Sequence, residues 1–99
     1  MAEYPLKIFE KLDPELLNLV ANTREPALAD GALPKRIKLL IAMALDTSQG
    51  AVQRVKALAQ SATQAGASKE EITEALRVAQ YVSGLGSVHT AAAVLRELF

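Results

Sequence analysis

The chain has 99 residues, a net charge of zero and no cysteine. This length suits a single domain of ordinary size, so we treat residues 1–99 as one unit. The lack of cysteine excludes disulfides, thiolate catalysis and thiolate metal sites, and a zinc site would depend mostly on carboxylates because the chain has a single histidine. We therefore expect neither a metal ion nor a cofactor.

The N-terminal sequence and the hydropathy pattern favour a soluble, cytoplasmic protein. Residues 1–13 lack the charged start, the apolar stretch and the small-residue cleavage site of a secretory signal. The longest apolar run, Leu39 to Leu45, is far shorter than the roughly 20 residues that cross a bilayer. We expect no membrane partner.

Charge is distributed unevenly along the chain. Residues 1–30 contain three basic and six acidic side chains, whereas residues 31–68 contain five basic side chains and one acidic. A mild positive field is therefore expected over the middle helices. The basic side chains either form a face that contacts only solvent or attract an anionic partner.

Apolar residues recur at helical spacing throughout, which predicts an all-α fold. Asp13–Glu15 is typical of a helix start, because an aspartate accepts hydrogen bonds from unpaired amides and a proline fits the first helical position. The preceding segment, Pro5–Leu12, predicts one or two further turns. Pro26 lacks an amide hydrogen, so the first long helix is expected to end or kink near Arg24. Asp30–Gly31 predicts a turn.

A second long helix is expected from Pro34 through Leu45. Its apolar residues surround nearly the whole circumference, which is typical of a buried helix. A polar break at Asp46–Gly50 separates it from the next helix, which is expected to stop at Gly66. The apolar stripe of that helix consists of Ala51, Val52, Val55, Leu58, Ala59 and Ala62.

The last third of the chain predicts two more helices. Ser68–Glu71 is a capping box that begins the first of them, and Gly84–Gly86 ends it. Ser87 is expected to cap the final helix. The buried faces are expected to consist of Ile72, Ala75, Leu76, Ala79 and Val82, and of Ala91, Val94, Leu95 and Leu98. The whole prediction is a compact bundle of about five to six helices.

Several short segments match the pattern of one known family. They are Ala65–Ser68, Glu70–Ile72, Ala75–Leu76 and the Tyr-x-x-Gly helix end at Tyr81–Gly84, with flanking matches at Leu6–Leu17 and Asp30–Leu33. Together they resemble the carboxymuconolactone decarboxylase and alkylhydroperoxidase D-like family over roughly residues 6–98. The resemblance implies an alkylhydroperoxidase D-like domain that assembles as a trimer or as a hexamer made of dimers.

The resemblance also implies where the family's catalytic residues would stand. In peroxidase-like members a glycine is followed by Cys-x-x-Cys-x-x-x-His, and a glutamate lies some helical turns upstream. When the chains are aligned without gaps from Ala65–Ala67, Gly50 matches the family glycine. The glutamate position is then Leu39, the two cysteine positions are Ala51 and Arg54, and the histidine position, which the decarboxylase members also keep, is Leu58. The resemblance therefore implies no thiol-dependent peroxidase activity, and whether another catalysis persists is open.

Four side chains are candidates for a ligand pocket. Arg54 offers a guanidinium that can bind a carboxylate or phosphate, or it forms a structural ion pair with Asp46 or with a neighbouring subunit. Asp46 is either a general acid or base, or a cap for a helix beginning near Gln49. Tyr81 offers a hydroxyl to the pocket or is an ordinary half-buried tyrosine. His89 either borders the pocket or faces solvent or an interface.

Three functions remain open from the sequence. The first is an oligomeric protein that binds a small molecule, such as an anionic metabolite at Arg54. The second is a non-catalytic assembly or scaffold subunit. The third is a DNA-binding helix-turn-helix around Ala65–Gly84, but its second helix, Lys69–Ser83, has more acidic than basic residues and matches phosphate poorly. The expected partners are other copies of the chain and a small anionic ligand, and no nucleic acid.

Overall fold

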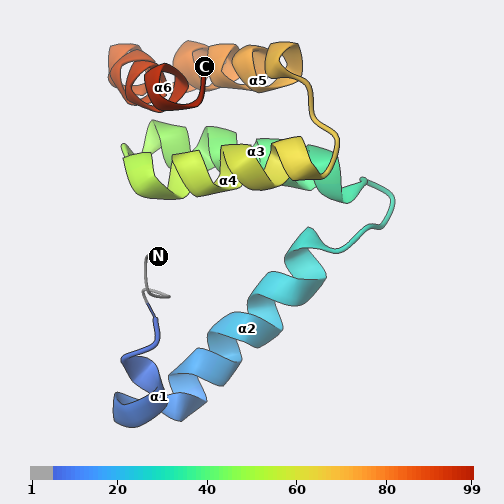
Figure 1. The fold of residues 1–99 in the computed structure, drawn as a ribbon, viewed down its shortest axis with the longest axis vertical. Coiled ribbons are helices and arrows are strands. Elements are labelled where there is room, and N and C mark those ends of the chain that lie inside the picture. Colours follow the sequence, from blue (N-terminus) through green and yellow to red (C-terminus); the bar gives the residue numbers. More distant parts are fainter. Residues whose placement is uncertain (1–5) are drawn as a thin grey trace.

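The computed structural model describes residues 6–99, and these residues form six helices (Figure 1). Their bounds are α1 Phe9–Leu12, α2 Pro14–Leu28, α3 Lys35–Ser48, α4 Val52–Gln64, α5 Lys69–Ser83 and α6 Leu85–Leu98. Helices α5 and α6 lie over one side of the α3–α4 pair, and α1 and α2 form an arm that extends away from the other side (Figure 1). The expected all-α fold of five to six helices is confirmed.

The arm begins where the sequence predicts a helix start. Asp13 caps α2 by accepting a hydrogen bond from the Leu16 amide at 3.0 Å, and Pro14 occupies the start of the helix. Helix α1 supplies one turn of the expected segment Pro5–Leu12, whereas Pro5 itself lies outside the described residues. Helix α2 contains no buried residue, so local hydrogen bonding rather than packing determines where it starts.

Pro26 does not end α2. The helix continues to Leu28, so the predicted end near Arg24 is wrong. A proline removes one amide donor and leaves the carbonyl of Asn22 without its helical partner. Asn22 is exposed, so water can hydrogen-bond this carbonyl, and the helix tolerates the loss in its last turn. The bend that follows contains the turn expected at Asp30–Gly31.

The hydrophobic core lies between the α3–α4 pair and the α5–α6 pair. Its small alanine side chains let the helices approach one another closely. Of the arm, Leu28 packs against the edge of this core. The buried members are Leu39, Leu40, Met43, Val55, Ala59, Ala62, Ala67, Ile72, Leu76, Ala91 and Val94. None of the six helices within residues 6–99 is both long and apolar enough to cross a membrane.

Helix α3 differs from its prediction in length and in burial. It continues past Leu45 to Ser48, so most of the expected polar break forms its last turn. The prediction that α3 is buried all round is wrong, because Ile41 and Leu45 are 46% and 62% exposed. Both lie on the opposite side of the helix from the fully buried Met43. One face of a strongly apolar helix therefore lies open in the single chain.

The capping box predicted at the start of α5 is present. The Ser68 hydroxyl accepts from the Glu71 amide at 3.0 Å, and the Glu71 carboxylate accepts from the Ser68 amide at 2.9 Å. Glu71 also forms an ion pair with Arg36 of α3. The start of α5 is thus fixed both by its own cap and by a contact with the neighbouring helix.

The joint between α5 and α6 differs from its prediction. Gly84 has a φ of 86°, a left-handed conformation that ends α5 as expected. Helix α6 begins directly at Leu85, so the predicted cap at Ser87 is wrong. Ser87 is buried, and its hydroxyl instead forms a hydrogen bond with the hydroxyl of Ser83 in the last turn of α5. Val82, at the edge of the apolar stripe of α5, is 76% exposed and not part of the core.

We expect Val55→Ala to lower the free energy of unfolding by about 2 kcal/mol, because it removes two buried methyl groups and leaves a cavity. Val78→Ala is a matched control, since Val55 is fully buried and Val78 is 60% exposed. The control should change stability by less than about 0.5 kcal/mol. Urea denaturation measures both effects, and equal losses would contradict the position of the core.

Ionised Glu71 is expected to stabilise the fold. Its pKa is lowered from the ordinary value of 4.5, chiefly by the hydrogen bond from the Ser68 backbone amide and further by Arg36, while burial acts in the opposite direction. A lowered pKa in the folded state means that the stabilisation is complete above the unfolded-state pKa and is lost as the pH falls through the folded-state pKa.

The stability difference between the wild type and Glu71→Gln should therefore shrink as the pH falls below about 4.5. Glu70→Gln, at the exposed neighbouring position, is the control, and its difference from the wild type should vary much less with pH. Urea denaturation at a series of pH values tests this. A constant difference for Glu71→Gln between neutral and strongly acidic pH would contradict the proposed role of the carboxylate.

Candidate functional site

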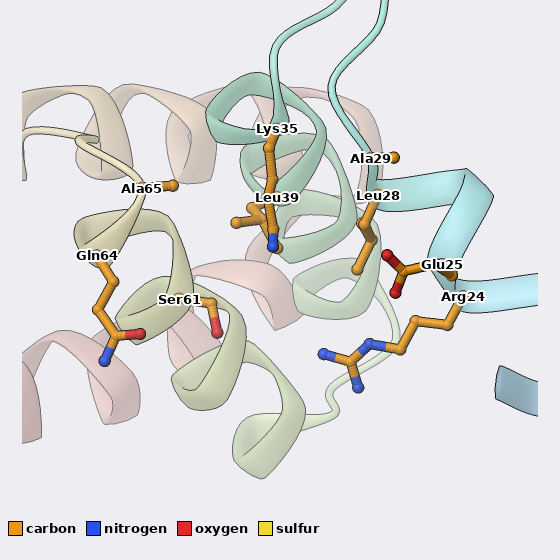
Figure 2. Close-up of a pocket in the computed structure, with 9 residues that line it drawn as sticks. All are labelled: Arg24, Glu25, Leu28, Ala29, Lys35, Leu39, Ser61, Gln64 and Ala65. Atoms are coloured by element: carbon orange, nitrogen blue, oxygen red, sulfur yellow. The ribbon is translucent and has the colours of Figure 1, made fainter.

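Two adjoining cavities lie where the C-terminal end of α2 meets α3 and α4. The Lys35 cavity, about 420 Å³, is lined by Arg24, Glu25, Leu28, Ala29, Lys35, Leu39, Ser61, Gln64 and Ala65 (Figure 2). The Arg54 cavity, about 290 Å³, is lined by Arg24, Leu28, Ala42, Asp46, Arg54, Ala57, Leu58 and Ser61. Because Arg24, Leu28 and Ser61 line both, the two cavities share a wall.

Three helices supply the walls of the Lys35 cavity. Figure 2 shows the Arg24 side chain reaching from α2 toward the side where Ser61 of α4 lies. Lys35, in the first turn of α3, extends alongside Leu39. Leu28 closes the wall on the α2 side. The cavity therefore exists because α2 continues past its proline, so that its end lies beside α3 and leaves a space between α2 and α4.

The Lys35 cavity combines positive charge with an apolar wall. Arg24 and Lys35 contribute two cations and Glu25 one anion. The ion pairs within residues 6–99 join Arg36 to Glu71, Arg54 to Asp46 and Lys56 to Glu97, so all three charged groups of this cavity lie outside them. Ser61 and Gln64 add neutral hydrogen-bonding groups. This combination suits a small molecule with one anionic group and a carbon skeleton.

In the Arg54 cavity the cation is already engaged. The Arg54 guanidinium donates to the Asp46 carboxylate at 3.0 Å and lies 3.5 Å from the Gln49 side-chain oxygen. Its side chain is 65% exposed, whereas that of Asp46 is 19% exposed. Asp46 does not cap the next helix, because the residue before α4 is Ala51 and no side chain caps it. The capping interpretation is therefore wrong, and the structural ion pair is present.

Three of the four positions singled out by the family resemblance line one of the two cavities. Leu39, almost completely buried, lines the Lys35 cavity. Arg54 and Leu58 line the Arg54 cavity. Ala51 precedes α4 and is not a lining residue of either cavity.

The two candidates from the C-terminal helices lie elsewhere. Tyr81 of α5 is 85% exposed, and His89 of α6 is also exposed. Neither is a lining residue of the Lys35 cavity or the Arg54 cavity, both of which involve α2, α3 and α4. Within residues 6–99, no group of three or more histidine, aspartate or glutamate side chains can hold a metal ion.

The sequence reasoning missed Arg24 and Lys35 as site residues. Pro26 predicts a helix end near Arg24, and the charge distribution identifies Lys35 only as part of a basic segment. Arg24 and Leu28 are four positions apart, so they share one face of a helix that continues through both. This spacing is the signal that would have located the wall of the cavity.

Comparison with known proteins agrees with this architecture. The family model of the carboxymuconolactone decarboxylase family matches residues 14–97. The apo crystal structure of a carboxymuconolactone decarboxylase family protein from Legionella pneumophila is similar, with a TM-score of 0.86 and 35% sequence identity over 92% of this chain and 81% of that chain. None of the curated proteins compared with the chain matches it. The chain therefore belongs to the carboxymuconolactone decarboxylase family.

Proposed function

We propose that this protein binds a small organic anion in the Lys35 cavity, as a homo-oligomer, and has no thiol-dependent peroxidase activity. The observation that carries the proposal is the presence of two cations, Arg24 and Lys35, beside an apolar wall in a single cavity. Both lie outside the ion pairs formed within residues 6–99. A carboxylate would therefore find donors that are not already committed to a protein acid.

The size and the remaining side chains narrow the ligand class. A cavity of about 420 Å³ lies in the range of small-molecule sites. The guanidinium of Arg24 can donate two parallel hydrogen bonds to one carboxylate, and Lys35 adds a point charge. Leu28 and Leu39 offer apolar contact to a carbon skeleton. Glu25 would repel a second carboxylate and accept a hydrogen bond from a hydroxyl or amine, so we propose a monocarboxylate with such a donor group.

Arg54 is a weaker anion site than the sequence suggests. An anion there would compete with the Asp46 carboxylate, which already accepts a hydrogen bond from the guanidinium. The exposure of Arg54 also leaves it in contact with water, which weakens any further ion pair. The proposal therefore places the ligand against Arg24 and Lys35 rather than against Arg54.

The chemistry of the family's peroxidases has no counterpart in these side chains. Reduction of a peroxide by protein thiols requires a thiolate that attacks oxygen and a second thiol that resolves the product. The chain has no cysteine, and neither cavity has histidine among its lining residues. We therefore assign the cavity to binding rather than to peroxide chemistry.

A scaffold subunit is the second candidate. It is favoured by the Arg54–Asp46 pair, which ties the end of α3 to α4 and thus has a structural role. The exposed apolar side chains of the arm also favour assembly, which by family resemblance would give a trimer or a hexamer. A scaffold would keep the assembly but bind no carboxylate at Arg24.

Arg24→Ala should weaken the binding of small monocarboxylates by roughly 10- to 100-fold, because a hydrogen-bonded charge pair is worth about 1.5 to 3 kcal/mol. Calorimetric titration with lactate, 3-hydroxybutyrate and benzoate measures the effect. Arg77→Ala, which removes an exposed arginine on α5, is the matched control and should leave affinity unchanged. If none of these acids binds the wild type, or if both variants bind equally, the scaffold function is the better account.

Purified protein should show no measurable turnover of hydrogen peroxide or cumene hydroperoxide with dithiothreitol as the reductant, because no protein thiol can relay the electrons. Peroxide consumption above the rate of dithiothreitol alone measures this. Robust turnover that Ser61→Ala or Arg24→Ala abolishes would show that the cavity performs peroxide chemistry by another route, and would contradict the assignment.

A further inference from the structure

The arm has an apolar stripe that the described chain leaves partly exposed. Leu16, Leu19 and Val20 are 39%, 59% and 39% exposed, and their spacing places them on one face of α2. Leu12 of α1 is 71% exposed beside the start of this helix. The stripe is thus a continuous apolar face on an element without any buried residue.

A helix that exposes an apolar stripe and has no buried residue gains stability when a partner covers the stripe. Helices of about 12 to 15 residues are marginal in water even with favourable sequences, and α2 contains a proline. Its attachment to the rest of the chain is at its end, where Leu28 packs against the core. Figure 1 shows the arm diverging from α3 toward its N-terminal end, so the arm of one chain does not lie along its own α3.

Helix α3 presents a matching face. Ile41 and Leu45 are exposed on the side opposite the core, and Lys38 lies on the same side at helical spacing. Helices α5 and α6 cover the other side of the α3–α4 pair (Figure 1), so this side remains open within the chain. The apolar sequence of α3 predicts that all its sides are buried. In the single chain the core buries one side, and Ile41 and Leu45 stay exposed on the opposite side.

The two segments that carry these faces differ in charge, and three of the five bases of α3 and α4 form ion pairs with Glu71, Asp46 and Glu97. Residues 6–28 contain four acidic and three basic side chains, whereas residues 35–64 contain five basic side chains and one acidic. Glu15 precedes Leu19 by one helical turn on the arm. Lys38 precedes Ile41 by three residues on α3, and its ammonium group donates to the carbonyl of Ala29 at 2.7 Å. Another exposed apolar surface, at Val78–Leu85, follows Glu74 and Arg77 and so offers no such excess of positive charge.

We infer that the α1–α2 arm of one copy docks on the Ile41–Leu45 face of α3 in a second copy of this chain. The docking covers the apolar stripe of the arm and completes the burial that the sequence of α3 calls for. It also places an arm with one more acidic than basic side chain against an α3–α4 layer whose Lys35 and Lys38 lie outside the ion pairs. Two copies can exchange arms reciprocally, or three can do so in a ring, and both arrangements use the same pair of faces.

Docking of the arm on a second copy would also hold Arg24 in place. The effect on ligand binding that follows from this rests on the proposed ligand site. Arg24 follows Val20 by one helical turn, so an arm fixed by its partner fixes the guanidinium at the wall of the Lys35 cavity. In an isolated copy the arm is held at Leu28 alone among the core contacts. The cavity of the single chain already includes Arg24, so the assembly would hold this side chain in place rather than supply it, and separation of the copies should weaken carboxylate binding.

The lack of native cysteine allows a direct test. A Leu19→Cys protein with a size tag is mixed with an untagged Leu45→Cys protein, allowed to exchange subunits, and treated with a short bis-maleimide cross-linker. A tagged–untagged adduct is expected, because the two positions meet only between copies. Val78→Cys replaces Leu45→Cys in the matched control, since both side chains are about 60% exposed. Cross-linking of Leu19→Cys to Val78→Cys but not to Leu45→Cys would overturn the inference.

Leu19→Glu provides an independent measurement. Light scattering at micromolar concentration should give a multiple of the 10.6 kDa chain mass for the wild type and a lower mass for Leu19→Glu. The α3–α6 body should stay folded, because α2 contributes no buried residue. An unchanged mass for Leu19→Glu would overturn the inference, as would a wild-type monomer.

The two proposals fail in different ways. Arg24→Ala should keep the wild-type mass and the cross-link while losing carboxylate binding, whereas Leu19→Glu should lose mass and weaken that binding at least several-fold. If the Leu19–Leu45 cross-link forms but no carboxylate binds, the ligand proposal is wrong and the interface stands. If carboxylates bind through Arg24 and the cross-link does not form, the interface is wrong and the ligand proposal stands.

Discussion

The structure depends on the burial of one face of α3. Leu39, Leu40 and Met43 form the centre of the core, and α4, α5 and α6 pack around them. Thr47 is buried on the same face because its hydroxyl donates to the carbonyl of Met43 at 2.7 Å, which satisfies the polar group within the helix. The cavities and the arm are arranged around the remaining sides of this helix.

Those remaining sides have different roles. One lines the Lys35 and Arg54 cavities through Leu39, Ala42 and Asp46, and another, opposite the core, exposes Ile41 and Leu45. A helix of 14 residues can serve a core, a site and an interface because its successive side chains point in different directions. Within the single chain the core and the cavities account for two of its apolar sides, and the inferred contact with a second copy would account for the third.

Much of the fold could be predicted from local signals. The Asp13 cap, the capping box at Ser68 and the left-handed Gly84 depend on residues that are neighbours in the sequence. The errors concern features decided by tertiary contacts or by solvent. Pro26 is tolerated because the carbonyl that it leaves unpaired is exposed, and Ser87 bonds to another helix rather than capping its own.

The candidate site was only partly predictable for the same reason. Arg54 and Leu58 could be placed beside a cavity from their position on α4, whereas Arg24 belongs to a separate helix whose length was misjudged. An arm that shares no buried side chain with the body also has a freedom that the body lacks. Its exposed residues can be substituted at little cost to the core beneath, whereas a change at Leu39 or Met43 would disturb every helix that packs there.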